Sequence, residues 1–160
     1  MRTEDVKVAV IRIEGTNCED EAERAWTVLG ARAEKLHLNQ LTGKAPAPDL
    51  RNLEDYHALF IPGGFSAGDY IRAGAMFAAR LKSKLGEELK DFVEEGKPVI
   101  GVCNGFQILV ELGLLPAIDK TMSDVPEAVL MTNDSGRFEC RPSLLKHENG
   151  GCCIFTSKIE

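Results

Sequence analysis

The chain alternates short apolar runs with longer segments in which apolar residues recur every three or four positions. The apolar runs predict four buried β-strands, at residues 6–13, 33–38, 58–61 and 99–102. The helical periodicity predicts amphipathic helices after the first, third and fourth of these strands. Because strands that alternate with helices are joined by right-handed crossovers, this order predicts an α/β fold with a mainly parallel sheet and helices on both faces.

The first predicted helix begins after Asn17, whose side chain favours an N-cap, and it ends at Gly30. Its apolar face consists of Ala22, Ala25, Trp26 and Leu29. We therefore expect Trp26 to lie in the core rather than to bind a ligand. The second helix has its apolar positions between Leu81 and Val93, ahead of Gly96.

The pattern changes from Ala128 onward to short extended segments separated by turn sequences. These turns are Asn133-Asp134-Ser135-Gly136 and Asn149-Gly150, and they predict antiparallel segments near the C-terminus that cover one edge of the sheet. With 160 residues, of which 44% are hydrophobic and 28% charged, the chain is expected to form a single domain over residues 1–160.

The candidate catalytic residue of the chain lies at a predicted strand-to-helix turn. Residues 99–107 read Val-Ile-Gly-Val-Cys-Asn-Gly-Phe-Gln, so Cys103 falls where the fourth strand meets the next helix. This arrangement is typical of a nucleophile elbow, with sulfur in place of a hydroxyl. Gly101 and Gly105 fit the same turn because it leaves little room for Cβ atoms. An inert cysteine in a glycine-rich turn has the same spacing and stays open as the alternative.

A second glycine-rich segment, Pro62-Gly63-Gly64-Phe65, follows the third predicted strand. A nucleophile that attacks a carbonyl needs N–H donors for the oxyanion that forms. We expect one donor from the backbone of Asn104, after the nucleophile, and another from Gly64. An ordinary turn remains the alternative for this segment.

These segments resemble the class I, or triad-type, glutamine amidotransferases. Within that class, Gly101 to Leu109 is similar to the nucleophile segment of the glutaminase subunits of phosphoribosylformylglycinamidine synthase. Four further segments carry the resemblance across most of the chain: Gly15 to Asp20, Pro62 to Ala75, Glu95 to Pro98 and Glu111 to Pro116.

The resemblance implies a flavodoxin-like fold and a reaction in which Cys103 attacks the carboxamide of glutamine. Ammonia leaves, a glutamyl thioester forms on Cys103, and water then releases glutamate. Gly64 and Asn104 would form the oxyanion hole, and Gln107 matches a position that binds glutamine. The resemblance further implies that ammonia passes to a large synthetase subunit, which uses ATP and Mg²⁺, and that a small third subunit assists. For this chain itself we expect no cofactor and no metal.

One part of the family pattern is missing from the sequence. The family completes its triad with a His-x-Glu segment, whereas the three histidines here, His37, His57 and His147, lack that pattern. We expect the chain to be the N-terminal portion of a longer domain and to be inactive alone. Two alternatives stay open: a cysteine hydrolase of the DJ-1/PfpI type, and a noncatalytic module that docks on the synthetase.

The bulk properties restrict the partners. A net charge of −6 argues against binding to nucleic acid or to anionic membranes, and no apolar run approaches the roughly 18 residues of a membrane span. The five cysteines form an odd set without metal-ligand spacing, which favours a reducing cytoplasm and a structural role for those other than Cys103. Residues 65–79 are the candidate docking loop for the synthetase.

Overall fold

The computed structural model describes residues 1–148 and 153–159. The chain divides into two compact units, Met1–Leu130 and Met131–Glu160. The first unit contains all the strands and helices found in the described residues. The described part of the second unit is largely exposed and consists of turns and irregular segments.

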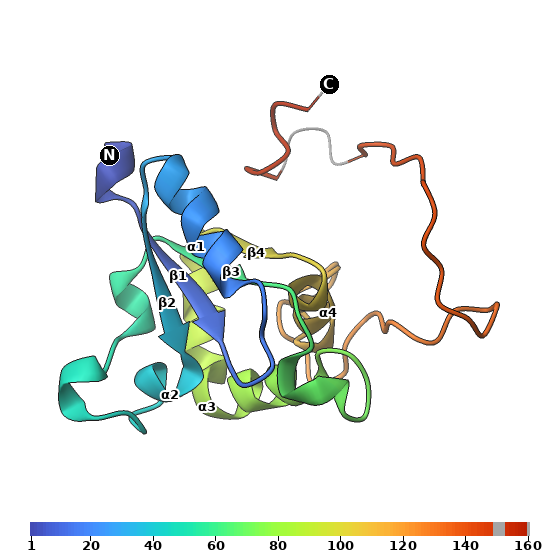
Figure 1. Cartoon of the computed structure of the whole chain (residues 1–160), viewed down its shortest axis with the longest axis horizontal. Helices are drawn as coiled ribbons and strands as arrows, with labels where there is room; N and C mark the ends of the chain where they lie inside the picture. Colours follow the sequence, from blue (N-terminus) through green and yellow to red (C-terminus); the bar gives the residue numbers. More distant parts are fainter. Residues whose placement is uncertain (149–152, 160) are drawn as a thin grey trace. The chain divides into compact units, whose positions relative to one another are not determined.

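Four parallel strands form the sheet of the first unit (Figure 1). They are β1 (Lys7–Arg12), β2 (Arg32–His37), β3 (Ala58–Ile61) and β4 (Val99–Gly101), in the spatial order β2-β1-β3-β4. Val10 of β1 pairs with Lys35 on one side and with Phe60 on the other. The predicted parallel sheet is therefore confirmed, with each strand within a residue of the predicted bounds.

Helices cover both faces of the sheet, also as predicted. The helices are α1 (Glu19–Val28), α2 (Leu38–Leu41), α3 (Ala75–Glu94) and α4 (Asn104–Glu111). Alternate residues of β1 point to opposite faces, so Ala9 and Ile11 share the large core with α3 and α4. Val8 points the other way and belongs to a smaller cluster that includes Trp26 of α1.

The start and the apolar face of α1 differ from the prediction. Cys18, not Asn17, is the N-cap residue, and the backbone N–H groups of Asn17 and Cys18 both donate to the carbonyl of Gly63, at 3.4 and 3.3 Å. Ala25 and Leu29 are exposed, with Leu29 67% accessible. The indole of Trp26 packs edge-to-face on Phe60 with the ring centroids 6.3 Å apart, so this bulky residue and Ala22 fill the narrow contact with the sheet.

The helix α3 starts earlier than its apolar pattern predicted. Residues 75–79 form its first turn and include the buried Phe77 and Ala78. The candidate docking loop is therefore shorter than predicted and ends at Gly74. None of the described helices is long and apolar enough to cross a membrane.

The antiparallel segments expected from Ala128 onward are absent from the described residues. The turn at Asn133–Gly136 does form, with Gly136 N–H donating to the carbonyl of Asn133 at 2.8 Å, but no strands flank it. An isolated hairpin is marginal in water unless an apolar face packs on a core, and here Leu144 and Leu145 are fully exposed. The second expected turn, Asn149-Gly150, lies outside the described residues.

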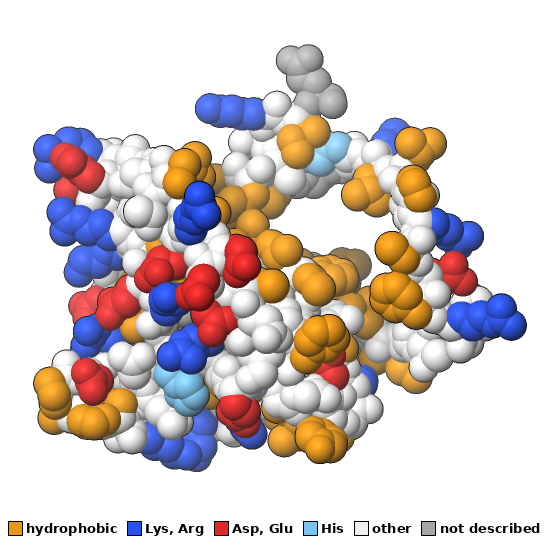
Figure 2. Space-filling model, in the orientation of Figure 1, with side chains coloured by type: hydrophobic (Ala, Val, Ile, Leu, Met, Phe, Trp, Pro, Cys, Tyr) orange, Lys and Arg blue, Asp and Glu red, His pale blue; other side chains and the backbone are white. Residues whose placement is uncertain are grey.

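Acidic and basic side chains are interspersed on the face of the molecule shown in Figure 2. Lys35 of β2, for example, contacts Asp20 at 2.6 Å and Glu23 at 3.2 Å, both on α1. Such exposed pairs contribute at most about 1 kcal/mol each, so the buried contacts of the sheet dominate the stability of this unit.

Candidate active site

Cys103 lies on a sharp turn between β4 and α4. It has φ 56° and ψ −115°, which places a non-glycine residue in a sparsely populated region of backbone conformation. The turn is closed by Gly105 N–H, which donates to the carbonyl of Val102 at 2.9 Å. The predicted elbow geometry is therefore present, and its cysteine is exposed.

The two glycines of the elbow are required by close backbone contacts. A Cβ on Gly105 would overlap the carbonyl oxygen of Ile61 in β3, and a Cβ on Gly101 would overlap the carbonyl of Gly105. The turn is thus pressed against the neighbouring strand, which fixes the height of Cys103 above the carboxyl edge of the sheet.

Gly63 brings a second cysteine close to the elbow. A Cβ built on Gly63 would lie 3.2 Å from Cys103 Cβ and 3.6 Å from Cys18 Sγ. Burial raises the pKa of the Cys18 thiol, and the charges of Glu21, Cys103 and Glu19 raise it further. From sequence, Cys18 was expected to have a structural role, and its proximity to Cys103 was not predicted. Its place directly after the loop that follows the first strand was the available signal.

The glycine-rich loop, residues 62–74, folds back on the loop that follows β1. Phe65 N–H donates to the carbonyl of Gly15 at 3.0 Å, and a Cβ on Gly64 would lie 2.6 Å from Asn17 N. Within the part of the chain that the structure describes, the backbone N–H groups of Gly64 and Asn104 have no acceptor. The described part of the protein therefore leaves both of these N–H groups without an acceptor, and their role as oxyanion donors stays a prediction.

The side chain of Asn104 links this loop to α4. Its Oδ1 accepts from Ser66 Oγ at 2.6 Å, and its Nδ2 donates to Asp69 Oδ1 at 3.0 Å and to Gln107 Oε1 at 3.1 Å. The structure thus brings Asn104 and Gln107 together. Ser66 and Asp69 were not singled out from sequence, since nothing local indicates a contact 38 residues away.

Neither histidine of the first unit lies beside Cys103. His37 ends β2 at the opposite edge of the sheet, three strand spacings of about 4.8 Å from β4. His57 lies at the amino end of β3, where its Nδ1 accepts from Lys7 N–H at 3.0 Å. His147 belongs to the second unit. As expected from sequence, neither His37 nor His57 is positioned as a base for Cys103.

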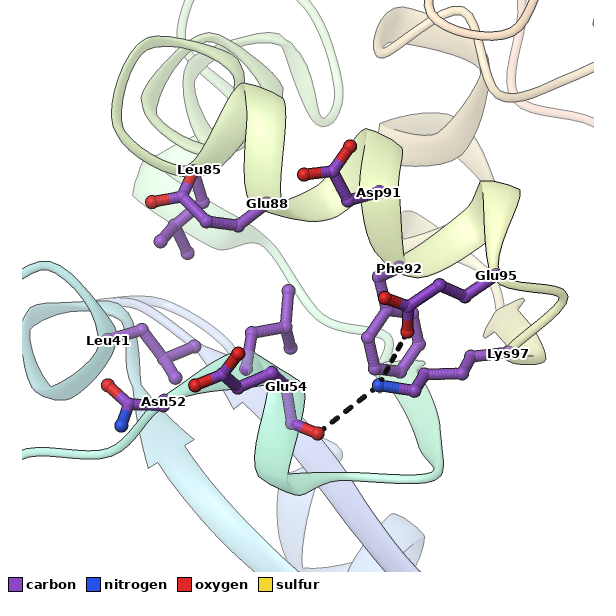
Figure 3. Close-up of a pocket in the computed structure, with 10 residues that line it drawn as sticks. Leu41, Asn52, Glu54, Leu85, Glu88, Asp91, Phe92, Glu95 and Lys97 are labelled. Carbon is purple, nitrogen blue, oxygen red and sulfur yellow. Dashed lines mark hydrogen bonds and ion pairs between the residues drawn. The ribbon is translucent and has the colours of Figure 1, made fainter.

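The pocket drawn in Figure 3 lies away from this site. It has a volume of about 280 Å³ between α3 and the segment at residues 52–54, with an apolar floor that includes Leu85 and Phe92. Lys97 crosses its rim, donating to the carbonyl of Glu54 at 3.2 Å and pairing with Glu95 at 3.0 Å (Figure 3). No predicted site residue lines it.

Comparison with known proteins identifies the family. Residues 5–160 match the family described as the CobB/CobQ-like glutamine amidotransferase domain. The chain belongs to this family. An amidotransferase assignment decides against the DJ-1/PfpI alternative.

Two curated relatives of this amidotransferase chain carry the same name. It is 51% identical to the phosphoribosylformylglycinamidine synthase subunit PurQ of Archaeoglobus fulgidus, covering 100% of this chain and 60% of that protein. It is 47% identical to PurQ of Picrophilus torridus, covering 84% of this chain and 50% of that one. The chain thus spans half to three fifths of the length of these curated relatives.

A solved structure agrees with the sequence relatives. A chain in the structure of PurLQS from Thermotoga maritima superimposes with a TM-score of 0.64 at 33% identity, covering 86% of this chain and 53% of that one. The predicted amidotransferase fold is therefore confirmed.

Proposed function

We propose that this chain carries the nucleophile of a glutamine-hydrolysing subunit that supplies ammonia for the amidination of formylglycinamide ribonucleotide in purine biosynthesis. The observation that carries the proposal is the strained, exposed Cys103 at the start of α4, in a chain that is 51% identical over its whole length to a PurQ subunit. Non-glycine residues held in sparsely populated backbone conformations cluster at functional sites, which supports a chemical role for the sulfur of Cys103.

In the proposed reaction, Cys103 Sγ attacks the carboxamide carbon of glutamine. The N–H groups of Gly64 and Asn104 stabilise the tetrahedral oxyanion, and Gln107 binds the substrate. Ammonia then leaves, and water hydrolyses the thioester to glutamate. Because these steps need a base, and neither His37 nor His57 is near Cys103, we expect the 160 residues alone to show no glutaminase turnover.

The ammonia would be consumed by a large synthetase subunit that uses ATP and Mg²⁺, assisted by a small third subunit, in the cytoplasm. The glycine-rich loop is the proposed contact with the synthetase. In support, its apolar side chains Phe65, Tyr70 and Ile71 are 68%, 75% and 81% exposed. Exposed apolar side chains that cluster on one loop are typical of an interaction site.

The test uses the complete subunit that contains this sequence, assembled with its synthetase. Cys103→Ser should abolish the glutamine-dependent reaction and leave the ammonia-dependent reaction unchanged, because only the supply of ammonia is lost. Cys18→Ser is the matched control and should retain glutamine use. Full glutamine-dependent activity in Cys103→Ser would reject Cys103 as the nucleophile.

A second candidate function is a noncatalytic docking module. The separation of both histidines in the first unit from Cys103, together with the exposed apolar loop, favours it for the chain taken alone. Binding of the 160-residue chain to the synthetase, with no glutaminase activity in the complex, would support this candidate. Glutamine turnover by that complex would exclude it.

A further inference from the structure

The buried amide of Asn104 joins α4 to Ser66 of the glycine-rich loop. Asn104 and Ser66 are each only 2% exposed. Burying an unpaired polar group costs roughly 1–3 kcal/mol, so such a pair persists where its hydrogen bonds are made. Ser66 Oγ and Asn104 Oδ1, 2.6 Å apart, satisfy each other.

The glycine-rich loop needs such an external contact. Three of its non-glycine residues, Ala67, Asp69 and Ile71, have positive φ values of 50°, 52° and 73°. Each left-handed residue of this kind costs of order 1 kcal/mol or more, so contacts with the rest of the protein must stabilise the observed conformation of the loop. The side chain of Asn104 forms hydrogen bonds to this strained segment on both sides of Ala67, with Ser66 and with Asp69.

The chemistry of the neighbours fixes which way the Asn104 amide faces. The backbone N–H of Ser66, 3.4 Å from Oδ1, can only donate, and the carboxylate of Asp69, 3.0 Å from Nδ2, can only accept. Asn104 must therefore present its oxygen to Ser66 and its NH₂ to Asp69. Gln107, 3.1 Å from the same NH₂, must then present its own oxygen to Asn104.

We propose that Asn104 is a positioning residue of the active site, whose side chain holds the glycine-rich loop beside Cys103 and orients the amide of Gln107. This inference depends on the function proposed above. The backbone of Asn104 supplies one oxyanion donor, and its side chain holds the loop that supplies the other, from Gly64. Since Gln107 Oε1 is engaged, its Nε2 is the group left to donate, so Gln107 would bind an oxygen of glutamine.

The decisive variant is Asn104→Asp, because it keeps the size of the side chain, removes the NH₂ donor and puts a negative charge in its place. Its carboxylate would face the carboxylate of Asp69 and the oxygen of Gln107. In the complete subunit with its synthetase, we expect kcat/KM for glutamine to fall about tenfold or more, a change equivalent to roughly 1.4 kcal/mol of transition-state stabilisation. The ammonia-dependent rate should not change. Amide hydrogen exchange over residues 62–74 should become several-fold faster.

A double variant separates positioning from a general loss of structure. In Asn104→Asp with Asp69→Asn, the carboxylate and the amide exchange places, so the link between loop and α4 can form again. Gln107 must then turn its NH₂ toward residue 104 and its oxygen toward the substrate. We expect amide hydrogen exchange over residues 62–74 and kcat to return toward their wild-type values, while KM for glutamine stays raised. A general loss of stability would not separate kcat from KM in this way.

Asn39→Asp adds the same charge at an exposed residue and should leave exchange and kinetics unchanged. Ser66→Ala, which removes only the Oγ contact, should give the same changes at smaller size even if Asn104→Asp folds poorly. Wild-type exchange in both Asn104→Asp and Ser66→Ala, or unaltered glutamine kinetics despite faster exchange, would overturn the inference. If Cys103→Ser still used glutamine, the proposed function itself would fail instead.

Discussion

Arg72 and Glu111 form a two-pronged ion pair that joins the glycine-rich loop to the last turn of α4. Arg72 Nε and Nη2 lie 2.5 and 2.6 Å from the two carboxylate oxygens of Glu111. Gly74 closes the same junction, because a Cβ there would lie 2.9 Å from the backbone nitrogen of Ile108. The loop beside Cys103 is therefore attached to α4 at its middle, through Asn104, and again at its end.

Glu111→Gln should loosen the end of this loop with little effect on the whole fold. Arg72 is 46% exposed and Glu111 10% exposed, so solvent screens one side of the pair, which we expect to contribute on the order of 1 kcal/mol to the free energy of unfolding. We expect tryptic cleavage after Arg72 to become several-fold faster while the urea midpoint shifts only slightly. Glu94→Gln, which removes the partner of Lys90 on α3, is the control and should not alter cleavage after Arg72. Equal cleavage rates in wild type and Glu111→Gln would contradict this role.

Gly105→Ala and Gly86→Ala should have opposite effects on stability. The added Cβ at Gly105 meets the carbonyl of Ile61, so the elbow must move away from β3, and we expect a loss of about 3 kcal/mol or more. At Gly86, inside α3, nothing lies within 4 Å, and alanine should gain roughly 0.5–1 kcal/mol. Urea unfolding of the two variants checks both signs. A tolerated Gly105→Ala would mean that the elbow is not confined by β3.

Tyr56 should make the stability of the fold depend on alkaline pH. Burial and the hydrogen bond of its hydroxyl to Glu34, at 2.6 Å, raise the pKa of Tyr56 well above its ordinary value near 10. As the pH rises through about 10, the unfolded chain loses a proton that the folded chain keeps, so the free energy of unfolding falls. Tyr56→Phe should be less stable than wild type at pH 7 by about 1 kcal/mol, and this deficit should shrink above pH 10.

Urea unfolding at pH 7, 9 and 10.5 measures this change for Tyr56. The exposed Tyr70 provides the control, since Tyr70→Phe should leave stability unchanged at each pH. If Tyr56→Phe lost the same free energy of unfolding at all three pH values, the pKa of the Tyr56 hydroxyl would not be raised in the folded chain.

The features that the sequence could predict are those with a local pattern. The strand at residues 58–61 has the observed bounds, and the elbow was found because strand, cysteine and helix are contiguous. The contacts of Asn104 with Ser66 could not be found, because only the folded sheet brings β3 and β4 side by side. The exposed Leu29 was misassigned since periodicity shows which residues share a face, not how wide a surface that face meets.

Cys103 offers a test of whether the elbow stores strain for the sake of function. At φ 56° and ψ −115° a Cβ is unfavourable, so Cys103→Gly should be more stable than Cys103→Ala by about 1 kcal/mol, even though glycine also gives the unfolded chain more freedom. At Ala25, exposed in the interior of α1, the backbone is helical, so Ala25→Gly should be less stable than the wild-type alanine by about 1 kcal/mol. Urea unfolding of Cys103→Gly, Cys103→Ala, Ala25→Gly and wild type gives the glycine-minus-alanine difference at each position. If glycine is more stable than alanine at position 103 and less stable at the comparison position, folding alone favours glycine at position 103, and the cysteine is present there for its chemistry. If the difference in the free energy of unfolding has the same sign at both positions, that explanation fails.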